Sequence, residues 1–269
     1  MPEPAGAQAQ AVVANGFVYT SVRIAGGDGT GGAPGAGPAG FQDQVRQVLA
    51  DLAAVLADAG SSLAHVVKVT TFLAEPRLAD YNRVYAEVFG TNLPARTTVT
   101  VEPSGSVLEL SCIAVTEAQD RSAPLRRIPN APGMAPVLGP YSQAVVANGF
   151  VFTSGQIPAV TSMADQPAEF GGKVRQVLAN LETVLLEAGS GLQHIAKVTT
   201  YLTDPDQLEE YNAVYGEVFG SQLPARTSCC VGIWDIALEI ECVAVVAGSG
   251  GPGFESTEAG SLPKERVDA

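Results

Sequence analysis

The chain carries two copies of one sequence pattern, and this repeat constrains the fold more than any other feature. The copies are offset by about 130 residues, the length of a whole domain and far longer than one solenoid repeat. The matching segments are 10–21 with 143–154, 45–60 with 174–189, 65–73 with 194–202, and 81–90 with 211–220. Two consecutive domains of the same fold are therefore expected.

The repeat also sets the expected domain boundaries. We predict one domain over residues 1–118, a linker over 119–127 and a second domain over 128–246. A glycine-rich stretch at 26–40 has the composition of a flexible loop or linker. The final segment, 247–269, has the composition of a disordered tail.

Each copy predicts the same order of secondary structure. In the second copy, the dipeptide Asn148–Gly149 lies between two β-rich runs, which is typical of a hairpin. Apolar residues recur at helical spacing over 174–189, a strand follows at 194–202, and a second amphipathic helix ends at Gly220. Two closing strands complete the order β-β-α-β-α-β-β. This order predicts an α+β domain in which both helices cover one face of a mixed sheet.

Composition limits the classes of function. Hydrophobic residues make up 46% of the chain and the formal net charge is -13, which predicts a packed core and argues against binding to a nucleic-acid backbone or an anionic membrane. The sequence starts without the pattern of a secretory signal and has no apolar stretch of membrane-spanning length, so we expect a cytoplasmic protein. No metal site is expected, because the cysteines lack metal-ligand spacing. They are Cys112, Cys229, Cys230 and Cys242.

Few residues are suited to catalysis. His65 and His194 occupy equivalent places before a strand, where a structural role is the better interpretation. Arg226 and Glu239 lie in the two closing strands, and they come close together if these strands pair as a hairpin; Glu241 shares the strand face of Glu239. An arginine can hold a carboxylate in a bidentate pair, and a glutamate can orient or activate water. A solvated or ion-paired surface is the alternative interpretation.

Several motifs of the second copy give the chain a specific resemblance. They include "GPYSQAV" at 139–145, "SGQIP" at 154–158, "LPART" at 223–227 and "LEIECVAV" at 238–245. With these motifs the second copy resembles the YjgF/Rid family, the reactive intermediate deaminases, across 128–246. The first copy resembles the same family more weakly, over about 8–116.

The resemblance implies a fold, an assembly and an activity. The fold is chorismate-mutase-like, and the assembly is a homotrimer with ligand clefts between neighbouring domains. The activity is hydrolysis of enamines and imines, such as 2-aminoacrylate, to 2-keto acids and ammonia, without a metal or an organic cofactor. The expected partner is therefore a small imine, enamine or keto acid that bears a carboxylate.

The resemblance also assigns roles to residues of the second copy. Arg226 matches the arginine that grips the substrate carboxylate, and Glu239 matches the glutamate that positions the attacking water. The remaining expected site residues line the cleft, and two of them depart from the family pattern: Ser228 stands where many members have cysteine, and Trp234 lies in an altered turn. The lining residues are Tyr141, Ser154, Gly155, Asn212, Ser228 and Trp234.

The first copy keeps only half of this set. It retains Arg96, Glu109 and Asn82, but Gln8 and Ala9 replace the tyrosine and serine of "GPYS". We therefore expect the main site at Arg226. Arg96 is expected to be a structural remnant or half of a site that another domain completes, for example with a second-copy tyrosine.

Three functions remain open from the sequence. The first is an enamine/imine deaminase with its main site in the second copy. The second is a tailoring enzyme of a biosynthetic pathway that catalyses a cyclisation, dehydration or hydrolysis on the same scaffold. The third is a small-molecule-binding protein without catalysis, because a fold does not fix a function.

Overall fold

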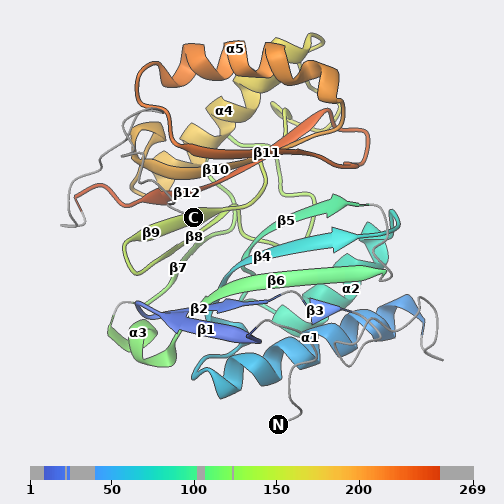
Figure 1. Ribbon diagram of the computed structural model, residues 1–269, viewed down its shortest axis with the longest axis vertical. Coiled ribbons are helices and arrows are strands. Elements are labelled where there is room, and N and C mark those ends of the chain that lie inside the picture. The colour runs from blue at the N-terminus through green and yellow to red at the C-terminus, as the bar shows by residue number, and fades with distance from the viewer. Residues whose placement is uncertain (1–8, 22, 25–39, 102–106, 123, 249–269) are drawn as a thin grey trace, which may run out of the picture.

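The computed structural model of the chain describes residues 9–21, 23–24, 40–101, 107–122 and 124–248. The expected loop at 26–40 and the expected tail at 247–269 lie almost wholly outside these residues. The described part contains two α+β units, one for each copy of the repeat (Figure 1).

The first unit forms one mixed sheet with two helices. Its strands lie in the order β1-β2-β6-β4-β5, and the short β3 also pairs with β6. The elements are β1 (Ala11–Ala14), β2 (Phe17–Thr20), β3 (Arg23–Ile24), α1 (Phe41–Asp58), the 3-10 turn η1 (Leu63–His65), β4 (Val66–Leu73), α2 (Leu78–Phe89), β5 (Ala95–Thr100) and β6 (Leu108–Val115).

The second unit repeats this plan and also has six strands, with the edge strand β7 in place of the short β3. Its strands lie in the order β11-β10-β12-β9-β8-β7. After the short helix α3 (Glu117–Ser122), the elements are β7 (Arg126–Ile128), β8 (Ala144–Ala147), β9 (Phe150–Thr153), α4 (Phe170–Glu187), η2 (Leu192–His194), β10 (Ile195–Leu202), η3 (Pro205–Gln207), α5 (Leu208–Phe219), β11 (Ala225–Cys230) and β12 (Leu238–Val245). The segment expected as a linker thus holds most of α3 and the start of β7.

The two closing strands do not pair with each other as a hairpin. β11 pairs in parallel with β10, and β10 pairs on its other edge with β12, so one strand separates the two. The cause is α5, because a helix between β10 and β11 returns the chain in the same direction and makes the pair parallel. Arg226 and Glu239 therefore lie on opposite sides of β10, in register with Val198 and Tyr201.

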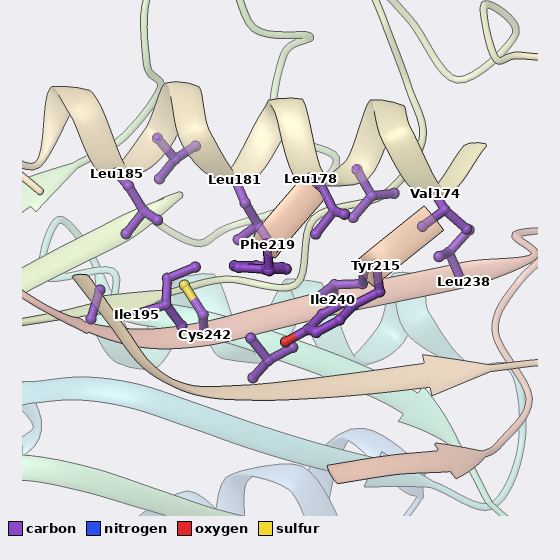
Figure 2. Packing of buried hydrophobic residues seen from close by; sticks show 14 of the residues in the cluster. Val174, Leu178, Leu181, Leu185, Ile195, Tyr215, Phe219, Leu238, Ile240 and Cys242 are labelled. Atoms are coloured by element: carbon purple, nitrogen blue, oxygen red, sulfur yellow. The ribbon is translucent and has the colours of Figure 1, made fainter. Parts of the chain in front are cut away.

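Apolar spacing explains why the long helices form and where they pack. The buried side chains of α4 include Val174, Leu178, Leu181 and Leu185, which recur every three or four residues and so share one face. Figure 2 shows these side chains pointing to the sheet and to Phe219 of α5. The burial of this face fixes both helices on one side of the sheet, as predicted.

The two units pack sheet against sheet, and their helices lie on the outside (Figure 1). A separate cluster of buried residues joins the two sheets: Phe17, Val67, Ala95, Val115, Val145, Ala147 and Phe152. Three aromatic rings from both units meet there, since the ring of Phe17 lies 6.0 Å from Phe150 and 5.6 Å from Phe152. Apolar burial of this kind holds the units in one fixed arrangement.

Candidate active site between the two copies

Arg96 of the first copy lies at the contact between the two units. Its guanidinium stands over the rings of Tyr81 at 5.2 Å and Tyr85 at 4.8 Å, both on α2, and over Tyr141 of the second copy at 5.3 Å. The residue is 5% exposed, and its Nη1 atom has no hydrogen-bond partner among the described residues. Aromatic faces attract this cation, but they leave the N–H groups of Nη1 available for an anion.

Hydrogen bonds from the second copy hold the backbone around Arg96. The amide of Ser142 donates to the carbonyl of Pro94 at 3.0 Å, and the amide of Gly155 donates to the carbonyl of Arg96 at 3.3 Å. The amide of Arg96 donates to Oγ of Ser154 at 2.8 Å. Ser154 is fully buried and its hydroxyl also donates to the carbonyl of Ser142 at 2.6 Å. Ser154 therefore positions the strand that carries Arg96, and its hydroxyl is already engaged.

Among the aromatic rings around Arg96, that of Tyr141 comes from the second copy. Its hydroxyl accepts a hydrogen bond from the amide of Leu138 at 3.2 Å, which fixes the ring against Arg96. Burial raises the pKa of this hydroxyl. Tyr141 is therefore neutral near pH 7 and acts as a wall and a hydrogen-bonding group.

Glu239 lies on β12, and its carboxyl group passes directly over Gly155. A Cβ atom at Gly155 would lie 1.6 Å from Oε1 of Glu239, so this arrangement requires glycine there. Glu239 is 7% exposed. Burial, followed by the charge of Glu241, raises the pKa of Glu239 to about 8, while the cations Lys68 and Arg96 act in the opposite direction. A carboxyl group with this pKa can donate or accept a proton near neutral pH.

A buried ion pair that bridges the two units lies beside Glu239. Nζ of Lys68 lies 2.5 Å from Oε2 of Glu241 and also donates to Oγ1 of Thr97 and to the carbonyl of Thr153, each at 2.7 Å. The hydroxyl of Thr97 donates to Glu241 in turn. Lys68 was missed in the sequence, because a lysine in a strand normally indicates an exposed face.

Arg96, Tyr141, Gly155 and Glu239 border a small cleft of about 80 Å³. Arg96 and Glu239 supply its charged side chains, and most of the remaining wall is apolar. The loop that follows β11 closes one side, because Thr100 and Gly232 exchange backbone hydrogen bonds of 2.7 and 2.8 Å across the two units. This pairing brings Trp234 to the cleft, where its Nε1 atom is buried without a hydrogen-bond partner among the described residues. The cleft is lined by Leu78, Arg96, Thr98, Leu138, Tyr141, Gly155, Ile157, Ile233, Trp234, Ile236 and Glu239.

The structure does not bring Arg226 to this cleft. Arg226 is exposed on β11, where its guanidinium stands over Tyr211 at 5.1 Å and Tyr215 at 4.7 Å, and it donates to Oδ1 of Asn212 at 2.7 Å. Ser228 lies on the same strand. The expected second-copy set is thus divided, and Arg226, Asn212 and Ser228 lie apart from Tyr141, Ser154, Gly155, Glu239 and Trp234.

The first-copy residues behave differently from one another. Asn82 lies close to the second copy, since a Cβ atom on Gly139 would be 3.1 Å from both its Nδ2 atom and Nη2 of Arg96. Glu109 lies on β6 opposite Phe72 and is not part of the cleft wall. Arg96 therefore borders the cleft, and Asn82 lies beside it, next to Gly139.

The described residues contain no group of three or more His, Cys, Asp or Glu side chains that could hold a metal ion. Among the helices of these residues, none is both long and apolar enough to cross a membrane. The two histidines lie in the equivalent turns η1 and η2, and Nδ1 of His65 is 2.9 Å from Oγ of Ser62.

Comparison with known proteins gives matches that have the length of one copy. A RutC family protein of Synechocystis sp. is 42% identical over 131 residues, which are 45% of this chain and 97% of that protein. A RutC family protein of Pyrococcus horikoshii is 39% identical over 40% of this chain and 87% of its own. The solved structure of Escherichia coli TdcF with bound serine has 32% identity and a TM-score of 0.42, and it covers 45% of this chain and 98% of its own.

The match to a family extends over both copies. The sequence model described as Endoribonuclease L-PSP matches residues 1–116 and 132–246, which is most of the chain. The motifs "GPYSQAV", "SGQIP" and "LPART" lie within these ranges. The chain therefore belongs to the YjgF/Rid family, as a member with two tandem domains.

Proposed function

We propose that the chain hydrolyses small 2-imino acids and their enamine tautomers to 2-keto acids and ammonia in the cleft between its two copies. The observation that carries this proposal is Arg96, a buried guanidinium whose Nη1 atom has no hydrogen-bond partner among the described residues. A guanidinium fork binds a carboxylate in two parallel hydrogen bonds. The same cleft holds Glu239, whose pKa of about 8 suits proton transfer at neutral pH.

The reaction needs little more than these two side chains. Arg96 holds the carboxylate of the substrate and places the C=N carbon beside Glu239, which replaces a random encounter by a fixed one. The protonated carboxyl group of Glu239 donates its proton to the imine nitrogen, and its other oxygen accepts a proton from the attacking water. The new C–O bond gives a carbinolamine, which expels ammonia and leaves the keto acid. Water supplies the oxygen, and no oxidant or reductant is required.

Matched arginine variants test this placement. In Arg96→Ala we expect keto-acid formation from enzymatically generated 2-aminoacrylate to fall by a factor of about 100 or more, because binding and orientation are both lost. In Arg226→Ala the rate should stay near that of the wild type. Loss of activity in Arg226→Ala alone would place the chemistry in the second copy and contradict the proposal.

A tailoring reaction on a larger substrate is the second candidate. Its support is the apolar part of the cleft wall, where Ile233, Trp234 and Ile236 come from the loop after β11. A substrate that needs cyclisation or dehydration would use the same arginine and the same proton donor. Failure of the protein on every simple imino acid, together with tight binding of a larger acid, would favour this candidate. Binding of keto acids without turnover of any imine would favour a non-catalytic role.

We further propose that the chain associates with itself as a homotrimer. The contact between the copies is head to tail, because β5 of the first packs on the inner face of the second. Val12, Val13 and Tyr19 of the first copy are exposed, which leaves an apolar surface on this unit for a further contact. Repeated head-to-tail contacts either close into a ring of chains or extend into an open filament. Light scattering that gives the mass of a single chain at micromolar concentration would contradict this assembly.

A further inference from the structure

A second and larger cavity adjoins the cleft. It has a volume of about 270 Å³, whereas the cleft has about 80 Å³. Four residues border both spaces: Leu138, Tyr141, Gly155 and Ile157. We call this cavity the side chamber. It lies within the second copy and is lined by Met134, Ala135, Pro136, Val137, Leu138, Tyr141, Gln143, Gly155, Gln156, Ile157, Ala159, Ser162, Met163 and Asn180.

The side chamber offers an apolar surface to a ligand. None of its lining residues is charged. Its amide side chains already have partners in the protein, because Oε1 of Gln143 accepts from the amide of Ala131 at 2.6 Å and Nε2 of Gln156 donates to the carbonyl of Ser154 at 3.2 Å. Nδ2 of Asn180 donates to two backbone carbonyls, each at 2.9 Å.

The lining is also adaptable. Met134 and Met163 line the chamber, and methionine side chains adjust to ligands of different shape. Ala159 contributes only a methyl group to the wall and is 5% exposed. The chamber therefore suits a flexible alkyl or aryl group better than a second polar group.

We infer that the side chamber receives the apolar substituent of the acid whose carboxylate Arg96 holds. The preferred ligands are then 2-imino and 2-keto acids with a long alkyl or arylalkyl chain. The chain of such an acid passes between Tyr141 and Gly155, which border both spaces. This inference rests on the proposed function for the position of the head group, and it adds the class of substrate.

The single tryptophan makes the inference measurable without turnover. Trp234 lines the cleft and is the only tryptophan of the chain, so its fluorescence reports binding of the acid head group. We would titrate pyruvate, 2-oxohexanoate and 2-oxooctanoate. The burial of each further methylene predicts a gain in affinity of up to about fourfold until the chamber is full. Arg96→Ala should weaken all three acids by a similar factor, because it removes the contact that they share.

Two variants of the chamber wall test its role. In Ala159→Phe the added ring fills the chamber, so the ratio of the affinities for 2-oxooctanoate and pyruvate should fall to near one. In Met163→Ala the chamber is larger, so the optimum should move to longer acids. The second variant keeps the test intact if the first fails to fold. Neither residue lines the cleft.

The outcomes separate this inference from the proposed function. Equal affinity of the wild type for all three acids overturns the side chamber as a binding site, and so does an unchanged affinity ratio in Ala159→Phe. If 2-aminoacrylate is still hydrolysed in that case, the proposed function stands alone. In a further outcome, the affinity rises with chain length in the wild type and not in Ala159→Phe, while no imine is turned over. That result supports the side chamber as a binding site and contradicts the proposed hydrolysis.

Discussion

The two "LPART" segments form nearly the same local structure and arrive at different environments. Arg96 and Arg226 each stand over two tyrosines of the preceding helix, at 5.2 and 4.8 Å in the first copy and 5.1 and 4.7 Å in the second. β5 is buried by the other copy, whereas most of β11 is exposed. The local sequence thus places each arginine over two tyrosine rings. Whether that arginine borders a cleft depends on whether a neighbouring unit packs over its strand.

The equivalent lysines repeat this contrast. Lys68 is 7% exposed and pairs with Glu241 of the other copy, whereas Lys197 donates to Thr227 of its own sheet at an exposed site. The comparison predicts that variants of the covered site have large effects and that the same variants of the open site have small ones.

The largest effect is expected for the proton donor. Glu239→Gln keeps the size of the side chain but cannot transfer a proton, so kcat should fall by a factor of about 10²–10⁴. Glu109→Gln in the first copy is the matched control and should retain most of the activity. In the wild type, kcat/KM should decline as the pH rises above about 8, the pKa of Glu239, because the acid form is lost. Equal loss in both variants would mean that the two glutamates act together.

Breaking the buried ion pair should have the next largest effect. Lys68→Met leaves Glu241 without its cation, and loss of one partner of a buried pair costs about 3–5 kcal/mol of unfolding free energy. Lys197→Met, at the exposed equivalent position, should change it by about 0.5 kcal/mol or less. Denaturant unfolding of both variants measures the difference. Similar values for the two would show that burial by the second copy does not matter at this pair.

Glu239 should also make stability depend on pH. Its pKa is about 8 in the folded chain against a usual 4.5, so the folded chain binds more protons than the unfolded chain between these values. The contribution is fully present below pH 4.5 and is lost as the pH rises to about 8. Glu239→Gln lacks this loss and should therefore be more stable than the wild type at pH 8. Parallel unfolding curves at pH 5 and pH 8 test the sign.

The smallest effect is expected for a glycine in the cleft. Gly155→Ala places a methyl group where Oε1 of Glu239 lies, so the carboxyl group must rotate away. We expect a loss of about 1 kcal/mol in stability and roughly tenfold in kcat/KM. Gly216→Ala, on α5 with no atom within 4 Å of the added Cβ, should instead be stabilising by about 0.5–1 kcal/mol. A fully active Gly155→Ala would separate the position of Glu239 from catalysis.

The sequence predicts the secondary structure of each unit, but it does not predict which residues of the two units come together in the cleft. The apolar spacing of Val174, Leu178 and Leu181 predicts a helix and its buried face, and the structure confirms both. The choice between Arg96 and Arg226 depends on which strand edge is covered, and both segments read "LPART". That cover is a tertiary contact, formed where Phe17 and Phe152 meet, and no local pattern encodes it.

The order of the closing strands shows the same limit. Arg226 and Glu239 are near in sequence, and a hairpin would have joined them. The alternation of Glu239 and Glu241 with apolar residues gives the correct face of β12, but the insertion of β10 beside it depends on the crossover through α5. Sequence spacing thus predicts which side chains share a face of a strand, but it does not predict which strands pair with it.

Covalent linkage of the two units frees each from having to carry a complete site. In a ring of identical single-domain chains, every subunit must supply both the edge strand that carries the arginine and the surface that carries the tyrosine. A substitution in either one therefore affects all sites at once. Here one polypeptide supplies the edge from its first half and the face from its second, at a ratio that dilution cannot alter. Substitutions such as Gln8 and Ala9 in the first half can then accumulate without loss of the cleft. Duplication followed by this division of labour leaves the unused halves open to new roles.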